Sequence, residues 1–184
     1  MKLQFESNQQ YQLDAIDAVV DIFAGQPADS DGTIRHMDRD GQLSLEATIA
    51  RGNSLTLDIV QIIKNTHKIQ EKNGIEKSET KEGGFSIPMT FPLEIGEKSL
   101  KYGMNFSVEM ETGTGKTYVY LRTIHELHQC YGWKKFIIVV PSVAIREGVL
   151  KNLAITGEHF ADLYNKPEMD YYVWDSKKTG QARE

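Results

Sequence analysis

The stretch METGTGKT, residues 110–117, constrains this chain more than any other part of the sequence. Gly113 and Gly115 allow backbone turns that are closed to residues with a side chain. The amides that follow can converge on a phosphate, and the helix expected next would aim its positive end at the same place. With a short strand before it and a helix after it, the stretch predicts a P-loop that binds a nucleotide.

Each position of this loop has an expected role. Lys116 is the expected catalytic residue, because its amine can reach the β- and γ-phosphates of ATP, and the hydroxyl of Thr117 can ligate Mg²⁺. The other expected nucleotide contacts are Thr112, Gly113, Thr114 and Gly115. Met110 stands where the strict pattern has glycine, a departure that many nucleic-acid motors tolerate. The alternative is a glycine turn followed by a chance Lys-Thr pair.

Hydrophobic periodicity predicts four helices, over residues 9–23, 55–71, 116–131 and from 142 to about 153. Short apolar segments at 105–110, 134–140 and 170–174 are expected to be strands. The continuous run at 134–140 is typical of a strand buried on both faces. Strands that alternate with helices predict an α/β fold, with a parallel sheet flanked by helices.

Composition divides the chain into three expected parts. Residues 1–24 hold the first helix, and residues 25–104 form an irregular or helical insertion rich in polar residues. Pro88 and Pro92 would confine any strand there to the edge of a sheet. Residues 105–184 form the P-loop lobe.

Charge and cysteine content limit the classes of function. The net charge of −5 argues against a dedicated basic coat for nucleic acid, although a local groove can be positive on an acidic protein. Cys130 is the single cysteine, which rules out an internal disulfide and suits a reducing cytosol. No apolar run approaches the roughly 20 residues of a membrane span. We expect a cytoplasmic protein without a membrane partner.

Gln12 in the first expected helix has a side-chain amide that matches the N6 and N7 edge of adenine. A glutamine upstream of a P-loop resembles the Q motif of superfamily 2 helicases and translocases. The alternative is a solvated helix residue, and the neighbouring Gln9 and Gln10 leave the register open. Phe5 or Tyr11 could stack on the base or belong to the core.

The segment VVPSVAIREGV, residues 139–149, resembles motif Ia of the same superfamily. A strand is expected to end there, Pro141 turns the chain, and Ser142 caps the next helix. Pro141 and Ser142 are therefore the candidate nucleic-acid contacts, with the first helix amides on a phosphate. An ordinary strand-to-helix turn is the alternative.

Together, EMETGTGKTYVYLRTIHEL at 109–127 and KKFIIVVPSVAIREGVLKN at 134–152 resemble the restriction (Res) subunit of type III restriction–modification enzymes. The tail YYVWDSKKTGQ and the long spacer after Gln12 are similar to that family too, so the resemblance covers nearly the whole chain. It implies a recA-like lobe of an ATP-driven motor on double-stranded DNA. It also implies a modification (Mod) methyltransferase subunit as partner, and cleavage by a separate C-terminal nuclease domain.

A motor also needs a carboxylate on Mg²⁺ and one that orients water, which superfamily 2 supplies as adjacent Asp and Glu. No Asp-Glu pair occurs in this sequence, and Asp175, a candidate for the Mg²⁺ acid, is followed by Ser176. We therefore expect an incomplete lobe: the N-terminal part of an ATP-dependent endonuclease, which binds ATP but hydrolyses little alone. The alternatives are another superfamily 2 helicase or translocase, a small-molecule or nucleotide kinase, and a non-catalytic nucleotide-binding module.

Overall fold

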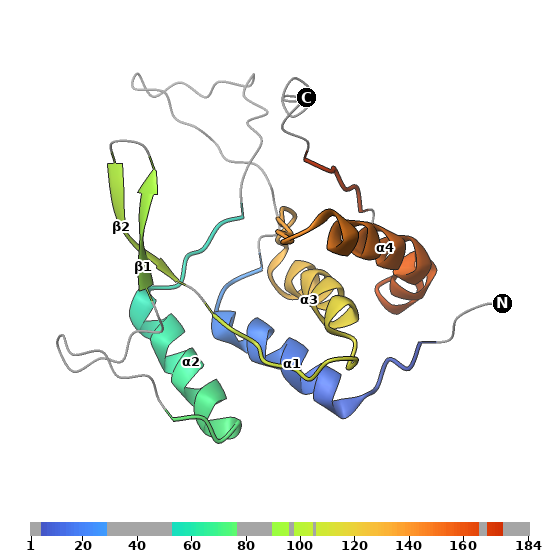
Figure 1. Ribbon diagram of the computed structural model, residues 1–184. Coiled ribbons are helices and arrows are strands. Elements are labelled where there is room, and N and C mark those ends of the chain that lie inside the picture. The colour runs from blue at the N-terminus through green and yellow to red at the C-terminus, as the bar shows by residue number, and fades with distance from the viewer. Residues whose placement is uncertain are drawn as a thin grey trace, which may run out of the picture.

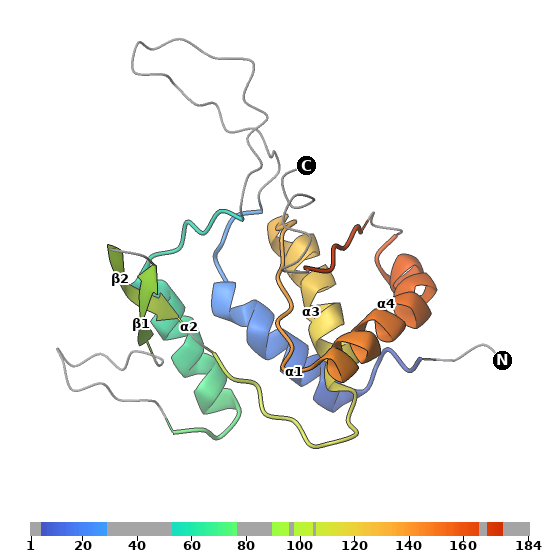
Figure 2. The same cartoon turned by 45° about the horizontal axis from the view of Figure 1, so that its top comes forward.

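Helices form most of the structure within the described residues. The computed structural model describes residues 5–28, 53–76, 90–95, 98–104, 106–165 and 169–174. Its helices are α1 (Gln10–Val20), the short 3-10 helix η1 (Asp21–Phe23), α2 (Ile59–Lys72), α3 (Lys116–Tyr131) and α4 (Val143–Leu163). Figures 1 and 2 agree that α3 lies between α1 and α4, whereas α2 and the strands lie to one side. All four expected α-helices are therefore present.

The described sheet is a two-stranded hairpin of β1 (Thr90–Ile95) and β2 (Lys98–Met104), which pair antiparallel. The register shifts between Phe91 and Leu93, on either side of Pro92. Proline has no amide hydrogen for the ladder, so an irregularity at this position is expected. In the part of the chain that the structure describes, each strand has a single partner, which agrees with the edge position predicted from Pro92, and Pro88 lies outside the described residues.

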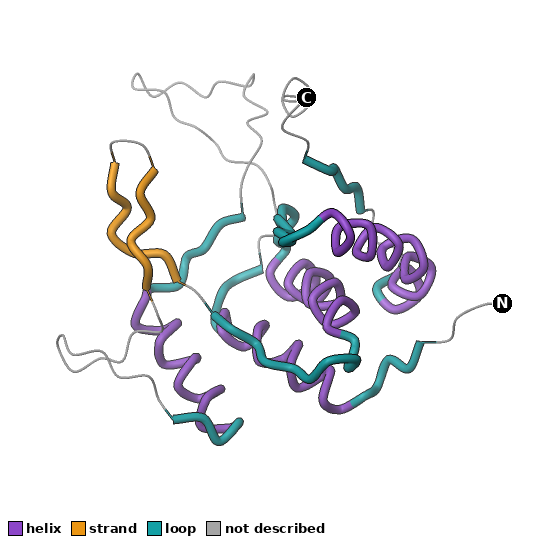
Figure 3. Tube along the Cα trace, in the orientation of Figure 1, coloured by secondary structure: helices purple, strands orange, loops and turns teal. Residues whose placement is uncertain are grey.

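The expected α/β fold with a parallel sheet, the recA-like lobe, is wrong for the part of the chain that the structure describes. Residues 106–110, 134–140 and 169–174 form no strand, as the tube in Figure 3 shows. An apolar run favours extended backbone, but a sheet requires a second strand about 4.8 Å away. The expected burial of 134–140 on both faces is also wrong, because Ile137 is 92% exposed and Val139 is 87% exposed.

At the start of segment 134–140, the side chain of Asn53 forms backbone hydrogen bonds of the kind that a neighbouring strand forms in a sheet. Its Oδ1 accepts hydrogen bonds from the amides of Lys134 and Lys135, at 2.9 and 3.0 Å. Its Nδ2 donates to the carbonyl of Lys135 at 2.6 Å. A single amide side chain can satisfy only these backbone groups, so the pairing does not extend along the segment.

Two hydrophobic clusters hold the helices together. The first lies between α3 and α4 and consists of Tyr118, Leu121 and Phe160, with Phe5, Tyr120, Leu153 and Tyr164 packed against it. The second lies where α3 ends against the first helix and consists of Leu127, Tyr131 and Trp133, with Val20, Phe23 and Phe136 packed against it. The start of α3 is thereby fixed to α4 and its end to α1 and η1.

A side chain caps α4 at the expected residue, whereas α2 begins at Ile59, four residues after the expected start, and has a different cap. Ser142 caps α4 by accepting a hydrogen bond from the amide of Ile145 at 3.3 Å, and Asp58 caps α2 by accepting from Gln61 at 2.7 Å. Helix α4 continues ten residues beyond the expected end at 153. Its extension buries Phe160, which is 2% exposed, against α3.

Buried side-chain amides join α2 and the segment before it to η1 and the residues that follow η1. Asn65 donates from Nδ2 to the carbonyls of Ile22 and Ala24, at 3.0 and 2.9 Å. Gln26 accepts from the amide of Thr56 at 2.9 Å. These bonds attach α2 and the segment before it to the residues just beyond α1.

Within the described residues, none of the helices has both the length and the apolar character needed to cross a lipid bilayer.

Candidate functional site

The glycine-rich loop precedes α3 in the expected place. Gly113 and Gly115 have φ angles of +84° and +86°, in the left-handed region that glycine adopts without strain. The hydroxyl of Thr114 donates to the carbonyl of Glu111 at 2.7 Å and closes the loop on itself. Helix α3 starts at Lys116, directly after Gly115. The first amides of a helix have no partner within it, so the loop ends on a cluster of donors suited to an anion.

Gln12 on α1 is in direct contact with this loop. Its Nε2 donates to the carbonyl of Thr114 at 2.9 Å, and the residue is 8% exposed. A Cβ atom on Gly115 would lie 2.8 Å from the same nitrogen. The alternative that Gln12 is a solvated helix residue is therefore wrong. Its amide holds the loop backbone, and only a glycine leaves room for it.

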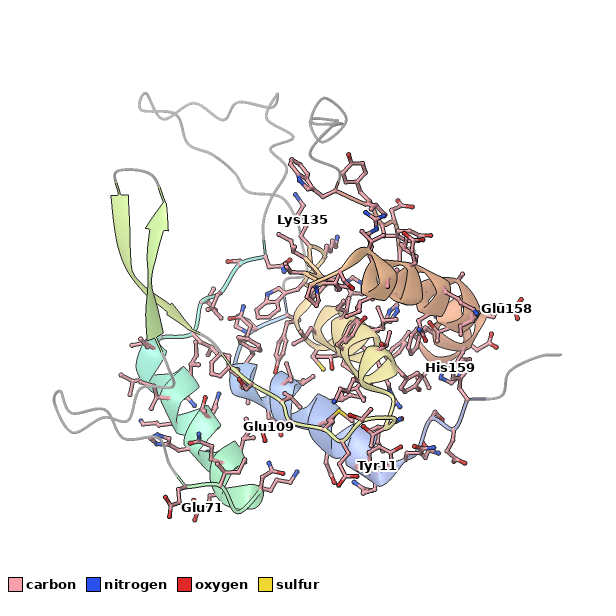
Figure 4. The ribbon with its side chains drawn as sticks, in the orientation of Figure 1. Tyr11, Glu71, Glu109, Lys135, Glu158 and His159 are labelled. Atoms are coloured by element: carbon pink, nitrogen blue, oxygen red, sulfur yellow. The ribbon has the colours of Figure 1, made fainter. Side chains whose placement is uncertain are left out.

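A pocket of about 590 Å³ opens at the start of α3. The glycine-rich loop, the N-terminal segment and α4 contribute its lining residues, which are Phe5, Glu6, Gln9, Gln12, Thr112, Gly113, Gly115, Lys116, Thr117, Tyr118 and Asn152. Every expected nucleotide contact lines this pocket except Thr114, whose carbonyl is held by Gln12. In Figure 4, Tyr11 and His159 lie toward this end of α3, and Lys135 lies beyond the other end.

Phe5 forms an aromatic wall on one side of the pocket. Its ring stacks on Tyr118 with centroids 6.0 Å apart and an interplanar angle of 11°, and it lies 5.2 Å from the ring of His159. The hydroxyl of Tyr118 and Nε2 of His159 are 2.9 Å apart and share a hydrogen bond. Phe5 packs against the core, as one alternative held, and it also lines the pocket, so its stacking on a base stays a prediction. Tyr11 is 48% exposed and does neither.

Burial shifts the pKa values of His159 and Tyr118, the two titratable side chains that pack against Phe5. It lowers the pKa of His159, with a further contribution from the charge of Arg122, and it raises the pKa of Tyr118. His159 is therefore neutral at neutral pH, and Tyr118 keeps its proton. Sequence reasoning missed both His159 and Asn152. His159 lies beyond the expected end of α4 near residue 153, and periodicity did not predict which face of α4 meets the pocket.

The other candidate residues lie elsewhere. Pro141 and Ser142 are exposed at the start of α4 and are not among the residues that line the pocket. Asp175, the candidate Mg²⁺ acid, lies outside the described residues. Among the described residues, no group of three or more His, Cys, Asp or Glu side chains is placed to hold a metal ion.

The family model and the relatives that match this chain all belong to one family. The family model described as "Type III restriction enzyme, res subunit" matches residues 7–182. The Res subunit of the EcoPI enzyme of Escherichia phage P1 is 32% identical over 97% of this chain, and that of EcoP15I of Escherichia coli is 31% identical over 96%. The StyLTI Res subunit of Salmonella typhimurium is 48% identical over 36% of the chain. The chain spans 16% of the length of the first and second of these relatives.

Proposed function

Because the chain belongs to the type III restriction enzyme Res subunit family, we propose that it is the ATP-binding N-terminal segment of an ATP-dependent DNA translocase and endonuclease. The observation that carries this proposal is the pocket at the start of α3, where the glycine-rich loop, Lys116 and Gln12 meet. Its volume of about 590 Å³ is within the range of small-molecule sites.

The phosphate end of ATP would lie on the glycine-rich loop. The positive φ angles of Gly113 and Gly115 turn the loop ahead of α3, and the first amides of α3 supply donors and the positive end of a helix dipole. Lys116 is exposed and lines the pocket, as a residue that reaches the β- and γ-phosphates must. Thr117 lines it too and would ligate Mg²⁺, which neutralises phosphate charge when bound.

The adenine end would lie against the N-terminal segment. Phe5 offers a ring face, and the amides of Gln9 and Gln12 are the polar groups on this side of the pocket. Gln12 would contribute in two ways, through its hydrogen bond to the carbonyl of Thr114 and through contact with the base. This arrangement favours an adenine nucleotide over a bare phosphate ligand.

The decisive experiment is a calorimetric titration of the chain with ATP and Mg²⁺, alongside a Lys116→Ala variant. Loss of Lys116 should weaken ATP binding by about tenfold or more, the scale of one charge-assisted hydrogen bond. Lys64→Ala, at an exposed position on α2, is the matched control and should bind ATP like the wild type. Equal binding by the wild type and Lys116→Ala would overturn the proposal.

Hydrolysis should remain low even where ATP binds. The chain has no Asp-Glu pair to hold Mg²⁺ and orient water, so a carboxylate set from the longer enzyme is expected to complete the site. Turnover measured with and without double-stranded DNA tests this point. Rapid hydrolysis that Lys116→Ala abolishes would contradict it.

Double-stranded DNA and a Mod methyltransferase subunit are the proposed macromolecular partners, on the basis of family membership. Pro141 and Ser142 are the proposed DNA contacts, because they are exposed at the start of α4, where helix amides can meet a phosphate. Co-purification with a Mod subunit would test the second partnership.

A further inference from the structure

A buried cation lies between α3 and α4, outside the pocket. Arg122 is 7% exposed and is not among the residues that line the pocket. A buried charge is costly unless it is paired and hydrogen-bonded, so the partners of Arg122 show what its burial achieves.

The partners of Arg122 come from three parts of the chain. Its Nε donates to the hydroxyl of Tyr164 at 3.1 Å and lies 3.7 Å from a carboxylate oxygen of Glu126. The Tyr164 hydroxyl in turn donates to the same oxygen of Glu126. Nη1 of Arg122 donates to the backbone carbonyl of Ser7. The Tyr164–Glu126 pair thus fixes the guanidinium, and the guanidinium holds the N-terminal segment.

Ser7 belongs to the segment that forms one wall of the pocket. Phe5, Glu6 and Gln9 all line the pocket and flank Ser7 in sequence. Phe5 also stacks on Tyr118, which lies four residues before Arg122 on α3. The bond to Ser7 is charge-assisted and therefore stronger than a bond between neutral groups. It ties this wall to the same helix that begins at the phosphate end of the pocket.

We propose that Arg122 is a positioning residue that sets the base side of the nucleotide pocket, and so controls affinity for the adenosine part of ATP but not for its phosphates. The proposal rests on the function proposed above. The phosphate end is formed by residues 112–117, which none of the bonds described for Arg122 reaches. Arg122 also interacts with the hydroxyl of Tyr118, the residue on which Phe5 stacks. The base end is formed by the segment that Arg122 holds through Ser7.

The test compares two ligands, Mg²⁺-ATP and Mg²⁺-tripolyphosphate, by calorimetry on the full chain. Arg122→Met should weaken ATP binding by about tenfold or more, as expected for loss of a charge-assisted hydrogen bond, and leave tripolyphosphate binding unchanged. Arg122→Lys should show a smaller loss than Arg122→Met, because the ammonium keeps the positive charge. Some loss should remain, because an ammonium cannot form the planar fork that reaches Ser7 and Tyr164 together. Arg146→Met, at a half-exposed arginine bonded to Glu147, is the matched control and should change neither affinity.

Tyr164→Phe keeps the test valid if Arg122→Met does not fold, because it removes only the hydroxyl that orients the guanidinium. It should reduce ATP affinity selectively, by less than Arg122→Met, with helix content unchanged by circular dichroism. Equal weakening of both ligands in the folded variants, or of neither, would overturn the positioning role while leaving ATP binding intact. A wild-type chain that binds neither ligand would instead overturn the proposed function itself.

Discussion

Gly115 occupies a position where a side chain would meet a neighbouring amide. Its φ angle is +86°, and a Cβ atom there would lie 2.8 Å from Nε2 of Gln12. Gly113 has a similar φ angle of +84°, but nothing lies within 4 Å of its Cβ position. A side chain would therefore strain the backbone at both positions, but it would cause a steric conflict only at Gly115.

Gly113→Ala should lower the free energy of unfolding by about 1 kcal/mol, the cost of a left-handed alanine. Gly115→Ala should cost roughly 1 kcal/mol more, and this excess should disappear in a Gln12→Ala background, as expected for residues in contact. Urea denaturation of the three single variants and of the Gln12→Ala, Gly115→Ala double variant measures the coupling. If Gly115→Ala costs the same with and without Gln12, the contact has no energetic weight.

Single residues of the site could be predicted where the chemistry is local. The spacing of Gly113, Gly115 and Lys116 indicates a phosphate loop without further information, and resemblance to known motors singled out Gln12. Arg122 could not be predicted, because an arginine in the middle of a helix normally lies in solvent. Its partners Ser7 and Tyr164 are distant in sequence, and only the packing of α4 on α3 brings them together.

Helices were the most predictable elements. The expected bounds 116–131 coincide with α3, and Gly132 ends the helix at φ +69°, as a left-handed glycine cap does. The length of α4 was underestimated, because hydrophobic periodicity alone does not reveal that Phe160 is buried against another helix. The strands could not be predicted reliably. A strand depends on a partner that local sequence does not specify, whereas the hydrogen bonds of a helix are internal.

The start of α4 combines a structural role with a proposed DNA contact, and one substitution separates the two. Aspartate caps helices as well as serine does, and its charge suits a helix N-terminus. Ser142→Asp should therefore preserve thermal stability while weakening binding to double-stranded DNA, because a carboxylate repels phosphate. Ser142→Ala should instead lower stability by about 1 kcal/mol through loss of the cap.

Thermal denaturation and fluorescence anisotropy with labelled duplex DNA measure these two quantities. The matched control is Asp58→Ser, the reverse exchange at the cap of α2, which should leave DNA binding unchanged. Undiminished DNA affinity in Ser142→Asp would remove Ser142 from the proposed DNA contacts.

Within the described residues, large apolar side chains are exposed at 137–139, whereas the neighbouring Phe136 packs against the second cluster. Ile137 and Val139 are 92% and 87% exposed, and Asn53 satisfies the backbone only at Lys134 and Lys135. Extended apolar segments with unpaired backbone groups favour association between chains. The 184-residue chain should therefore self-associate as its concentration rises.

The double variant Ile137→Lys and Val139→Lys should suppress this association without loss of thermal stability, since both side chains already lie in solvent. Sedimentation velocity over a range of concentrations measures the effect. A wild-type chain that stays monomeric throughout would show that the segment does not promote association.

The hydrogen bond from Gln12 to Thr114 has a consequence for how the protein is made. Its two residues are 102 positions apart in the chain, so the first helix emerges from the ribosome long before the loop that it holds. At about 5–20 residues per second, translation of that interval takes on the order of 5–20 seconds. During that time the nascent chain has no pocket. Under the proposed function, cellular ATP would therefore stabilise this polypeptide only late in its synthesis, and a product released before residue 114 would gain no such protection.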